Sequence, residues 1–514
     1  MTKKYLIGVD LGTSGTKAAL YQIDGVKIAE ASVEVPIYYP KPGVVEQDSK
    51  DFYETAALTV SRCIQQSNVV PQEVTAIAFD SQMAGVGLID ESYQAVGRFD
   101  SWLDVRCKPY IEWMDKEAGD QITQLTGCPP TCDHGPKMLW WKHEHPQDYK
   151  RTAKFLMPAA YVAGRMAGLK SDQAFMDYTF IHFSGFSDAR QTRWSRELCA
   201  KFDLDLDKLP RIVEPWEVVG EVTEQCARDF NLAPGIPIAA GAGDTAANAL
   251  GAGIVNPGMI FDVAGTAAVL ASCTDMFVAD TKNRALLNMR SVIPGLWNPL
   301  AYIAGGGLAL RWFRDQFYNA SHGIPQPVAD GLDLYPEMIE LAASVEPGSA
   351  GLLFSPHLGG RICPSTPEMR GAWIGASWSH TQAHLMRALL ESIALEYAYY
   401  LRILRELLPS LELVQARGAG GGARSPIWNQ IKADILDVPY QRLKGNEFGT
   451  WGAAMIAGKA AGVINDLAAH AAHTVFTEGE PALPNLENRK IYQPLVEKYI
   501  RMQQTLATFF TSNV

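Results

Sequence analysis

The sequence predicts an α/β protein with mixed sheets, divided into two large domains. Apolar runs rich in β-branched and aromatic residues, which favour strands, alternate along the chain with segments of helical periodicity. The chain has 514 residues, a length that usually divides into more than one hydrophobic core. A hairpin motif near residue 10 recurs near residue 262, about half a chain later, which indicates an internal duplication.

The first hairpin motif has the sequence DLGTSGTK and lies between two apolar runs that favour strands, 5–9 and 17–23. A tip of small residues exposes backbone N–H groups, which bind anions and phosphate in particular. Thr13 and Ser14 add hydroxyl donors, and Lys17 adds a cation. Asp10 would repel phosphate unless a divalent metal ion, or water bound to it, lies between them. These residues indicate a site for magnesium and a nucleotide; an ordinary hairpin capped by Asp10 is the structural alternative.

The next elements lead to a second acidic residue. Residues 51–67 are predicted to form a helix and 73–80 a strand, while 235–253 runs from a strand through a glycine turn into a helix. Asp244 stands at the start of that helix, where it is either an N-cap or a general base that points into a cleft. The residues alone leave both roles open.

The second hairpin motif is predicted over 258–272. Between two apolar runs it contains, in this order, Asp262, Gly265 and Thr266. This is the order of acid, glycine and threonine seen in the first motif. This tip would offer a second cradle for phosphate, and two cradles across a cleft would hold a polyphosphate at two points. Chance recurrence in a glycine-rich chain is the alternative.

The later part of the chain adds a long helix and a glycine-rich turn. The helix is predicted over 380–409, where Pro409 ends it, and its apolar stripe belongs to a core. A strand over 411–418 leads into GAGGGARS at 418–425, and a helix follows over 427–436. The glycines would let a purine or ribose approach the backbone. They also match a loose dinucleotide pattern, G-x-G-x-x-A.

A candidate sugar site comes from the segment DSWLDVRC. Asp104 and Arg106 are two residues apart and would share one face of a strand. There they would hydrogen-bond a polyhydroxyl ligand, with Trp102 and Trp140 packed on the face of a sugar. A surface ion pair between the acid and the arginine is the alternative.

Composition and charge limit the remaining classes. The net charge of −11 argues against nucleic acid as a partner. Eight scattered cysteines suit reduced thiols in the cytoplasm. Cys128, Cys132 and His134 have metal-like spacing, but no second pair nearby completes a tetrahedral zinc site. No apolar stretch is long enough for a signal peptide or a membrane helix, so we expect a cytoplasmic protein without a membrane partner.

In this order the motifs resemble the FGGY family of carbohydrate kinases, which includes xylulokinase and glycerol kinase, over about residues 5–460. Besides the two hairpins, the segments that carry the resemblance are GDTAANALGAG, SPHLGGRICP with RGAW, HLMRALLESIA, GGGARSPIWNQIKADIL and EFGTWGAAMIAG. The resemblance implies two actin-like, ribonuclease H-like ATPase domains with a cleft between them. Residues 1–246 would form the sugar and catalytic side, and residues 247–514 the nucleotide side.

The resemblance also implies that the protein uses ATP and Mg²⁺. Asp10 would hold Mg²⁺ through water, and Asp244 matches the catalytic base of the family. The residues that would meet the nucleotide are Gly12, Thr13, Ser14, Lys17, Gly265, Thr266, Gly307, Arg311, Gly421, Gly422 and Ser425.

The sugar side resembles xylulokinases less closely. Ala84 stands where they carry the histidine of Gln-Met-His-Gly, and Leu103 replaces the asparagine of W-N-D-x-R. The expected substrate is D-xylulose, a related pentulose, or another ketose or polyol. The expected substrate-binding residues are Gln82, Met83, Trp102, Asp104, Arg106, Asp133, His134 and Asp244.

Other classes remain open at this point. They are a catalytically silent regulatory protein that binds sugar or nucleotide on the same fold, a nicotinamide dehydrogenase that uses GAGGGA, and a chaperone-like ATPase. Intact Asp10 and Asp244 argue against the first class. A homodimer is expected by analogy with the family.

Overall fold

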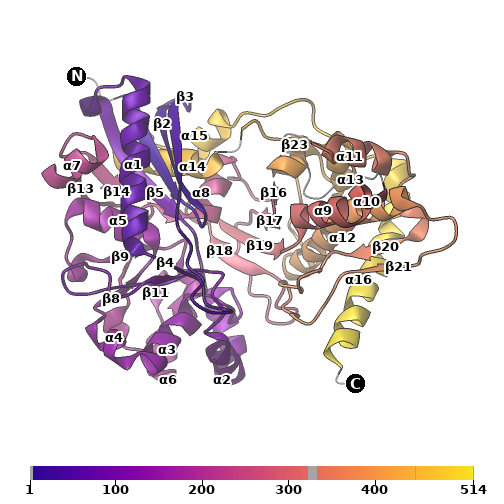
Figure 1. Ribbon diagram of the computed structural model, residues 1–514, viewed down its shortest axis with the longest axis horizontal. Coiled ribbons are helices and arrows are strands. Elements are labelled where there is room, and N and C mark those ends of the chain that lie inside the picture. The colour runs from indigo at the N-terminus through magenta and orange to yellow at the C-terminus, as the bar shows by residue number, and fades with distance from the viewer. Residues whose placement is uncertain (1–3, 322–332, 446, 513–514) are drawn as a thin grey trace.

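Two mixed β-sheets organise the chain in the computed structural model, which describes residues 4–321, 333–445 and 447–512. In Figure 1 the first sheet lies in the indigo half of the molecule, and the second lies nearer the centre. Each sheet therefore belongs to one half of the chain.

The first sheet has the strand order β13-β14-β5-β1-β2-β3, and β15 also pairs with β5. Its strands are β1 (Tyr5–Leu11), β2 (Gly15–Gln22), β3 (Lys27–Glu34), β5 (Val74–Ser81), β13 (Val218–Glu221), β14 (Pro237–Ala239) and β15 (Ala242–Gly243). The strands predicted over 5–9, 17–23 and 73–80 are thus confirmed. Since β1 runs antiparallel to β2 and parallel to β5, Asp10 stands opposite Lys17 on one side and Asp80 on the other.

The second sheet repeats the centre of the first. Its order is β18-β19-β17-β16-β22-β23, and β16 pairs antiparallel with the following strand β17 and parallel with the later strand β22, as β1 does with β2 and β5. The internal duplication is confirmed at this level. The strand predicted over 411–418 begins only at Gln415. The strands are β16 (Met259–Ala264), β17 (Ala268–Ser272), β18 (Leu287–Arg290), β19 (Trp297–Ile303), β22 (Gln415–Ala419) and β23 (Tyr440–Arg442).

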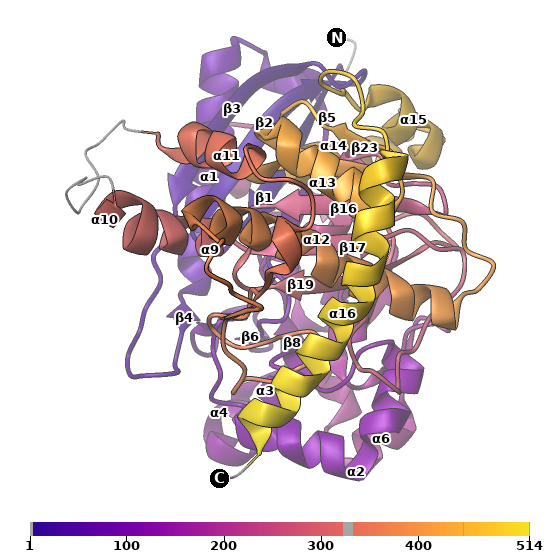
Figure 2. The same ribbon diagram turned by 90° about the vertical axis from the view of Figure 1, so that its right-hand side faces the viewer.

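The two long predicted helices are confirmed. Helix α1 (Ser49–Ser67) follows Asp48, whose side chain accepts the N–H of Lys50 at 2.9 Å and so caps the first turn. Helix α12 (Gln382–Leu407) ends just before Pro409, which cannot continue a helix. Figure 2 shows α16 crossing the outer side of the second half, where it packs on α12 and α13.

The remaining helices and strands cover the sheets or join them. The helices are α2 (Lys108–Thr126), α3 (His134–Glu144), α4 (Pro146–Arg151), α5 (Pro158–Ala167), α6 (Arg196–Lys201), α7 (Glu224–Phe230), α8 (Asp244–Gly251), α9 (Gly306–Phe313), α10 (Asn319–Ser321), α11 (Tyr335–Ala343), α13 (Pro426–Leu436), α14 (Phe448–Ala460), α15 (Leu467–Thr474) and α16 (Leu486–Thr511). The short strands are β4 (Glu46–Gln47), β6 (Gly87–Ile89), β7 (Phe99–Asp100), β8 (Lys154–Leu156), β9 (Phe175–Asp177), β10 (Ser187–Asp188), β11 (Arg193–Trp194), β12 (Arg211–Val213), β20 (Leu353–Ser355) and β21 (Ala372–Ile374).

Helix α14 comes late in the chain but packs on the first sheet, against β1, β5 and α8. Glycines make this close approach possible. A Cβ atom on Gly8 would lie 1.8 Å from the backbone oxygen of Thr450, and one on Gly452 would lie 2.0 Å from that of Ala247. A side chain at either position would therefore push the helix away from the sheet.

Candidate active site

The tip of the first hairpin is held by residues from the proposed sugar side. Gly12 donates its N–H to the backbone oxygen of Gly15 at 3.0 Å, which closes the turn between β1 and β2. The hydroxyl of Thr13 accepts the indole N–H of Trp102 at 2.8 Å, and its backbone oxygen accepts from Gln47 at 2.9 Å. Ser14 is exposed at the tip. The predicted phosphate and sugar contacts thus meet at one turn.

Asp10 lies near the end of β1 beside other charged groups. Burial, and next the negative charge of Asp244, raise the pKa of Asp10 to about 7, while Lys17 opposes the shift. Lys17 forms an ion pair with Glu447 at 3.3 Å, with 46% of its own side chain exposed. Carboxylates from distant parts of the chain therefore gather at the end of β1.

Asp244 is brought to the same place by strand pairing. Ala242 and Gly243 pair with β5 beside Asp80 and Ser81, so the following residue lies at the end of the first sheet. The N-cap of α8 is Gly243, and Asp244 is the first helical residue; the N-cap interpretation is therefore wrong.

The carboxyl group of Asp244 is held by its neighbour. Its Oδ1 accepts the backbone N–H of Thr245 at 2.6 Å and the Thr245 hydroxyl at 3.1 Å. Burial raises the pKa of Asp244 to about 6, against the effect of these hydrogen bonds.

Asp80 lies outside every motif that the sequence indicates for the site. It is fully buried on β5, and among the described residues neither of its carboxyl oxygens receives a hydrogen bond. Burial, and then the charges of Asp10 and Asp244, raise its pKa well above the ordinary value. The available signal was an acid at the end of the otherwise apolar segment AIAFD. The structure thus adds a third carboxyl group to the two that the sequence indicated.

The second hairpin tip is fixed by the start of α9. The backbone oxygens of Gly265 and Thr266 accept N–H groups from Gly307 at 2.8 Å and Leu308 at 3.0 Å. A Cβ on Gly307 would lie 2.6 Å from the oxygen of Gly265, so a glycine is needed there. Arg311 is exposed on the same helix.

The glycine-rich turn packs on the strand that leads to this tip. Gly420 has a φ of +85°, and a Cβ there would lie 2.8 Å from the backbone oxygen of Ala264. A Cβ on Gly421 would meet open space, whereas one on Gly422 would lie 2.8 Å from the Cβ of Ala264. Ser425 caps α13 by accepting the N–H of Trp428 at 3.3 Å. Most of the predicted nucleotide residues of the second half therefore surround the end of β16.

Asp262 has a different environment from Asp10, despite its similar motif. It is fully buried, accepts the hydroxyls of Tyr397 at 2.8 Å and Tyr440 at 2.6 Å, and pairs with Lys432. Its carboxylate is therefore occupied inside the second half.

Asp104 and Arg106 lie in turns after β7, so the prediction that they share a strand face is wrong. They do contact each other, with an Nη2–Oδ2 distance of 2.7 Å, but the Asp104 carboxylate is fully buried and Arg106 is only partly exposed, so this is not a surface pair. Arg106 also pairs with Glu46 at 2.8 Å and lies 4.7 Å above the ring of Trp140. Because these charges already have partners, the pair fixes the turn that presents Trp102, which is 40% exposed.

The other predicted sugar residues, which are Gln82, Met83, Asp133 and His134, are all buried. Gln82 donates to the side chain of Gln47 at 2.7 Å, and a Cβ on Gly243 would lie 2.6 Å from Met83. Asp133 and His134 start α3. Among the described residues, Oδ1 of Asp133 and both ring nitrogens of His134 have no hydrogen-bond partner. These atoms remain available to a polar ligand or to water.

The metal-like spacing of Cys128, Cys132 and His134 does not build a metal site in the described part of the chain. Within the described ranges, no group of three or more His, Cys, Asp or Glu side chains is arranged to hold a metal ion. An ion at Asp10 would therefore take many of its ligands from water or phosphate, as Mg²⁺ commonly does.

Comparison with known proteins tests the resemblance. The sequence model of the FGGY family of carbohydrate kinases matches residues 5–251 with its N-terminal domain and residues 263–461 with its C-terminal domain. The chain belongs to the FGGY family of carbohydrate kinases. A xylulose kinase of Bacillus subtilis is 28% identical over 507 residues, which cover 96% of this chain and 96% of that protein. A gluconokinase of the same species is 27% identical over 516 residues, with 99% and 97% covered.

The FGGY fold prediction is confirmed. The crystal structure of xylulose kinase from Rhodospirillum rubrum superposes with a TM-score of 0.89 at 26% identity, covering 99% of this chain and 100% of that one. The two mixed sheets are thus those of the actin-like, two-domain sugar kinases. Relatives named for a ketose and for an aldonate occur at similar identity, so family membership alone does not define the sugar.

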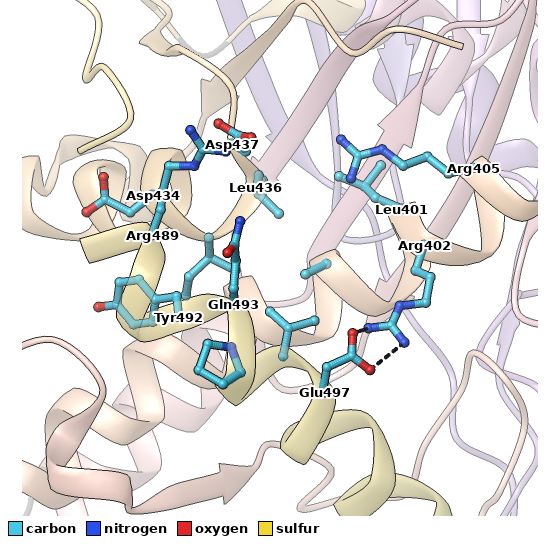
Figure 3. Close-up of a pocket in the computed structure, with 14 residues that line it drawn as sticks. Leu401, Arg402, Arg405, Asp434, Leu436, Asp437, Arg489, Tyr492, Gln493 and Glu497 are labelled. Atoms are coloured by element: carbon cyan, nitrogen blue, oxygen red, sulfur yellow. Dashed lines mark hydrogen bonds and ion pairs between the residues drawn. The ribbon is translucent and has the colours of Figure 1, made fainter. Parts of the chain in front are cut away.

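A separate cavity of about 570 Å³ lies between α12, α13 and α16 of this FGGY chain (Figure 3). Arg402 reaches Glu497 across one side of it, and Arg489 pairs with Asp437 on the other. None of the predicted site residues lines this cavity.

In the described parts of the chain, no helix combines the length and apolarity needed to cross a bilayer.

Proposed function

We propose that the protein transfers the γ-phosphoryl group of ATP to a hydroxyl of a ketose or polyol, with D-xylulose or a related pentulose as the first choice. The observation that carries the proposal is the meeting of Asp10 and Asp244 at the end of the first sheet, beside a hairpin tip rich in N–H groups. Family membership supports the reaction class.

Asp244 acts as the general base in this proposal. It accepts the proton of the sugar hydroxyl as that oxygen attacks the γ-phosphorus. Lys17 and the N–H groups of the tips at 13–14 and 265–266 stabilise the charge that spreads over the phosphoryl oxygens. Most of the acceleration then comes from positioning and preorganised electrostatics.

Mg²⁺ fits the same end of the sheet. The unpartnered oxygens of Asp80 and the partly buried carboxyl of Asp10 are hard ligands that suit a divalent cation. Asp10 would hold it through water. When bound, the ion would neutralise part of the negative charge of the phosphates.

An ADP-release screen tests the proposal over pentuloses, hexuloses, polyols and aldonates. We expect sugar-dependent ADP release with a ketose or polyol. Release with an aldonate alone would contradict the pentulose assignment. If a sugar binds but ADP release is absent with every compound, the catalytically silent regulatory protein is the better account.

The proposed base predicts a pH dependence. Because the pKa of Asp244 is raised to about 6, falling pH protonates the base near that value. We expect kcat/KM to fall roughly tenfold per pH unit below this pKa. Steady-state rates across the transition measure it, with circular dichroism at each pH as the control for folding. A flat profile through this range would contradict the assignment.

The second hairpin predicts a nucleotide effect. Thr266→Val removes an exposed hydroxyl at the tip. We expect ATP to bind on the order of 10- to 100-fold more weakly, because a hydrogen bond to a charged acceptor is worth about 1.5–3 kcal/mol. Titration calorimetry measures the affinity, and Thr505→Val, exposed on α16, is the matched control. Unchanged ATP affinity in Thr266→Val would count against the second cradle.

A further inference from the structure

Two cysteine thiols face each other beside the proposed sugar site. Cys107 immediately precedes α2, and Cys132 lies in the loop before α3; their Sγ atoms are 3.6 Å apart. A disulfide requires about 2.0 Å between the sulfurs, so a small movement of one loop would bring them into bonding range. All eight cysteines are reduced in this structure.

Cys132 has the surroundings of a reactive thiol. It is the one cysteine that is partly exposed, and its Sγ lies 3.8 Å from the Nζ of Lys137. Lys137 is fully buried, and its positive charge acts on Cys132 as well as on the carboxyl groups of Asp133 and Asp100. The hydrogen bond from Cys107, and also Lys137, lower the pKa of Cys132 to about 7 although burial opposes the shift.

The pair is joined to the residues proposed for sugar binding. The thiol of Cys132 donates to the backbone oxygen of Asp104 at 2.7 Å. Lys137 donates to the backbone oxygens of Cys132 at 2.7 Å and Ala84 at 2.9 Å. Asp133 follows Cys132 directly in the chain. A covalent change at Cys132 would therefore move the loop that carries Asp133.

We propose that Cys107 and Cys132 form a modification site for hydroperoxides, which oxidise the pair to a disulfide and weaken sugar binding. The effect on the sugar rests on the proposed function; the chemistry at the thiols does not.

The oxidation has two balanced steps. The Cys132 thiolate attacks one peroxide oxygen, an S–O bond forms, the O–O bond breaks, and the leaving oxygen takes a proton to become alcohol or water. The sulfur is oxidised to a sulfenic acid while the peroxide is reduced. Cys107 then attacks this sulfur, the S–S bond forms, the S–O bond breaks, and hydroxide leaves as water with the thiol proton.

Peptide mapping of the full-length protein tests the site. The protein is treated with hydrogen peroxide, its remaining thiols are alkylated, and linked peptides are identified by mass spectrometry. We expect a Cys107–Cys132 link that dithiothreitol reverses and that both Cys107→Ser and Cys132→Ser abolish. Cys199→Ser, which changes a buried thiol elsewhere, is the matched control and should keep the link. Full alkylation of both thiols after peroxide treatment would overturn the proposal.

The second measurement follows the sugar. After complete oxidation we expect the KM for the sugar to rise about 10- to 100-fold, the scale for misplacing a contact, with little change in the KM for ATP. Cys107→Ser should not respond. An unchanged sugar KM in the fully linked protein would refute the effect on binding. A link that forms in a protein without kinase activity would refute the proposed function and leave the modification site standing.

Discussion

Asp244→Asn is expected to lower kcat by about two to four decades, the scale of general-base catalysis. The amide keeps nearly the same shape and can still accept the Thr245 N–H, but it cannot take the proton of a sugar hydroxyl. Asp244 stands at the end of the first sheet, whereas the predicted nucleotide residues of the second half surround the end of β16. Since the substitution leaves those residues unchanged, we expect the variant to bind ATP with nearly normal affinity.

Kinetics and calorimetry together separate these two effects. Turnover is measured with the best sugar from the ADP-release screen, and ATP affinity is measured by titration. Asp207→Asn, an exposed carboxylate of the same half, is the matched control and should retain normal rates. Near-normal turnover in Asp244→Asn would show that Asp244 is not the general base.

Lys432→Met is expected to destabilise the fold by about 3–5 kcal/mol. Lys432 is fully buried, pairs with Asp262, and lies 4.5 Å from the ring of Trp428. Its loss leaves Asp262 in the interior with two tyrosine hydroxyls as partners but without a compensating charge.

Urea denaturation followed by circular dichroism measures the free energy of unfolding. Lys50→Met breaks an exposed pair with Glu54, in which the side chains are 72% and 56% exposed, and is expected to cost less than about 1 kcal/mol. Equal losses in the two variants would show that the buried pair contributes no more than a surface pair.

Local chemistry explains what the sequence predicted correctly. Strand and turn propensities act over a few residues, so both hairpins, α1 and α12 could be placed from the chain alone. Many of the proposed site residues lie at the hairpin tips, so they too could be predicted from local sequence. The internal duplication could be predicted because the same short motif occurs at both tips.

Long-range contacts explain what was missed. Asp10 and Asp262 follow similar patterns, but the partners that occupy Asp262 are Tyr397, Lys432 and Tyr440, far along the chain. Asp80 belongs to no motif, and only the register between β1 and β5 places it beside Asp10. Sequence periodicity does not contain such pairings.

The position of α14 has a consequence for biosynthesis. Domains generally fold in order as they leave the ribosome. Here the first sheet lacks the helix that covers β1 and β5 until residues 448–460 have been made. Until that helix has been made, the face of the first sheet that it covers stays exposed, so the first sheet cannot complete its core before residues of the second half are available.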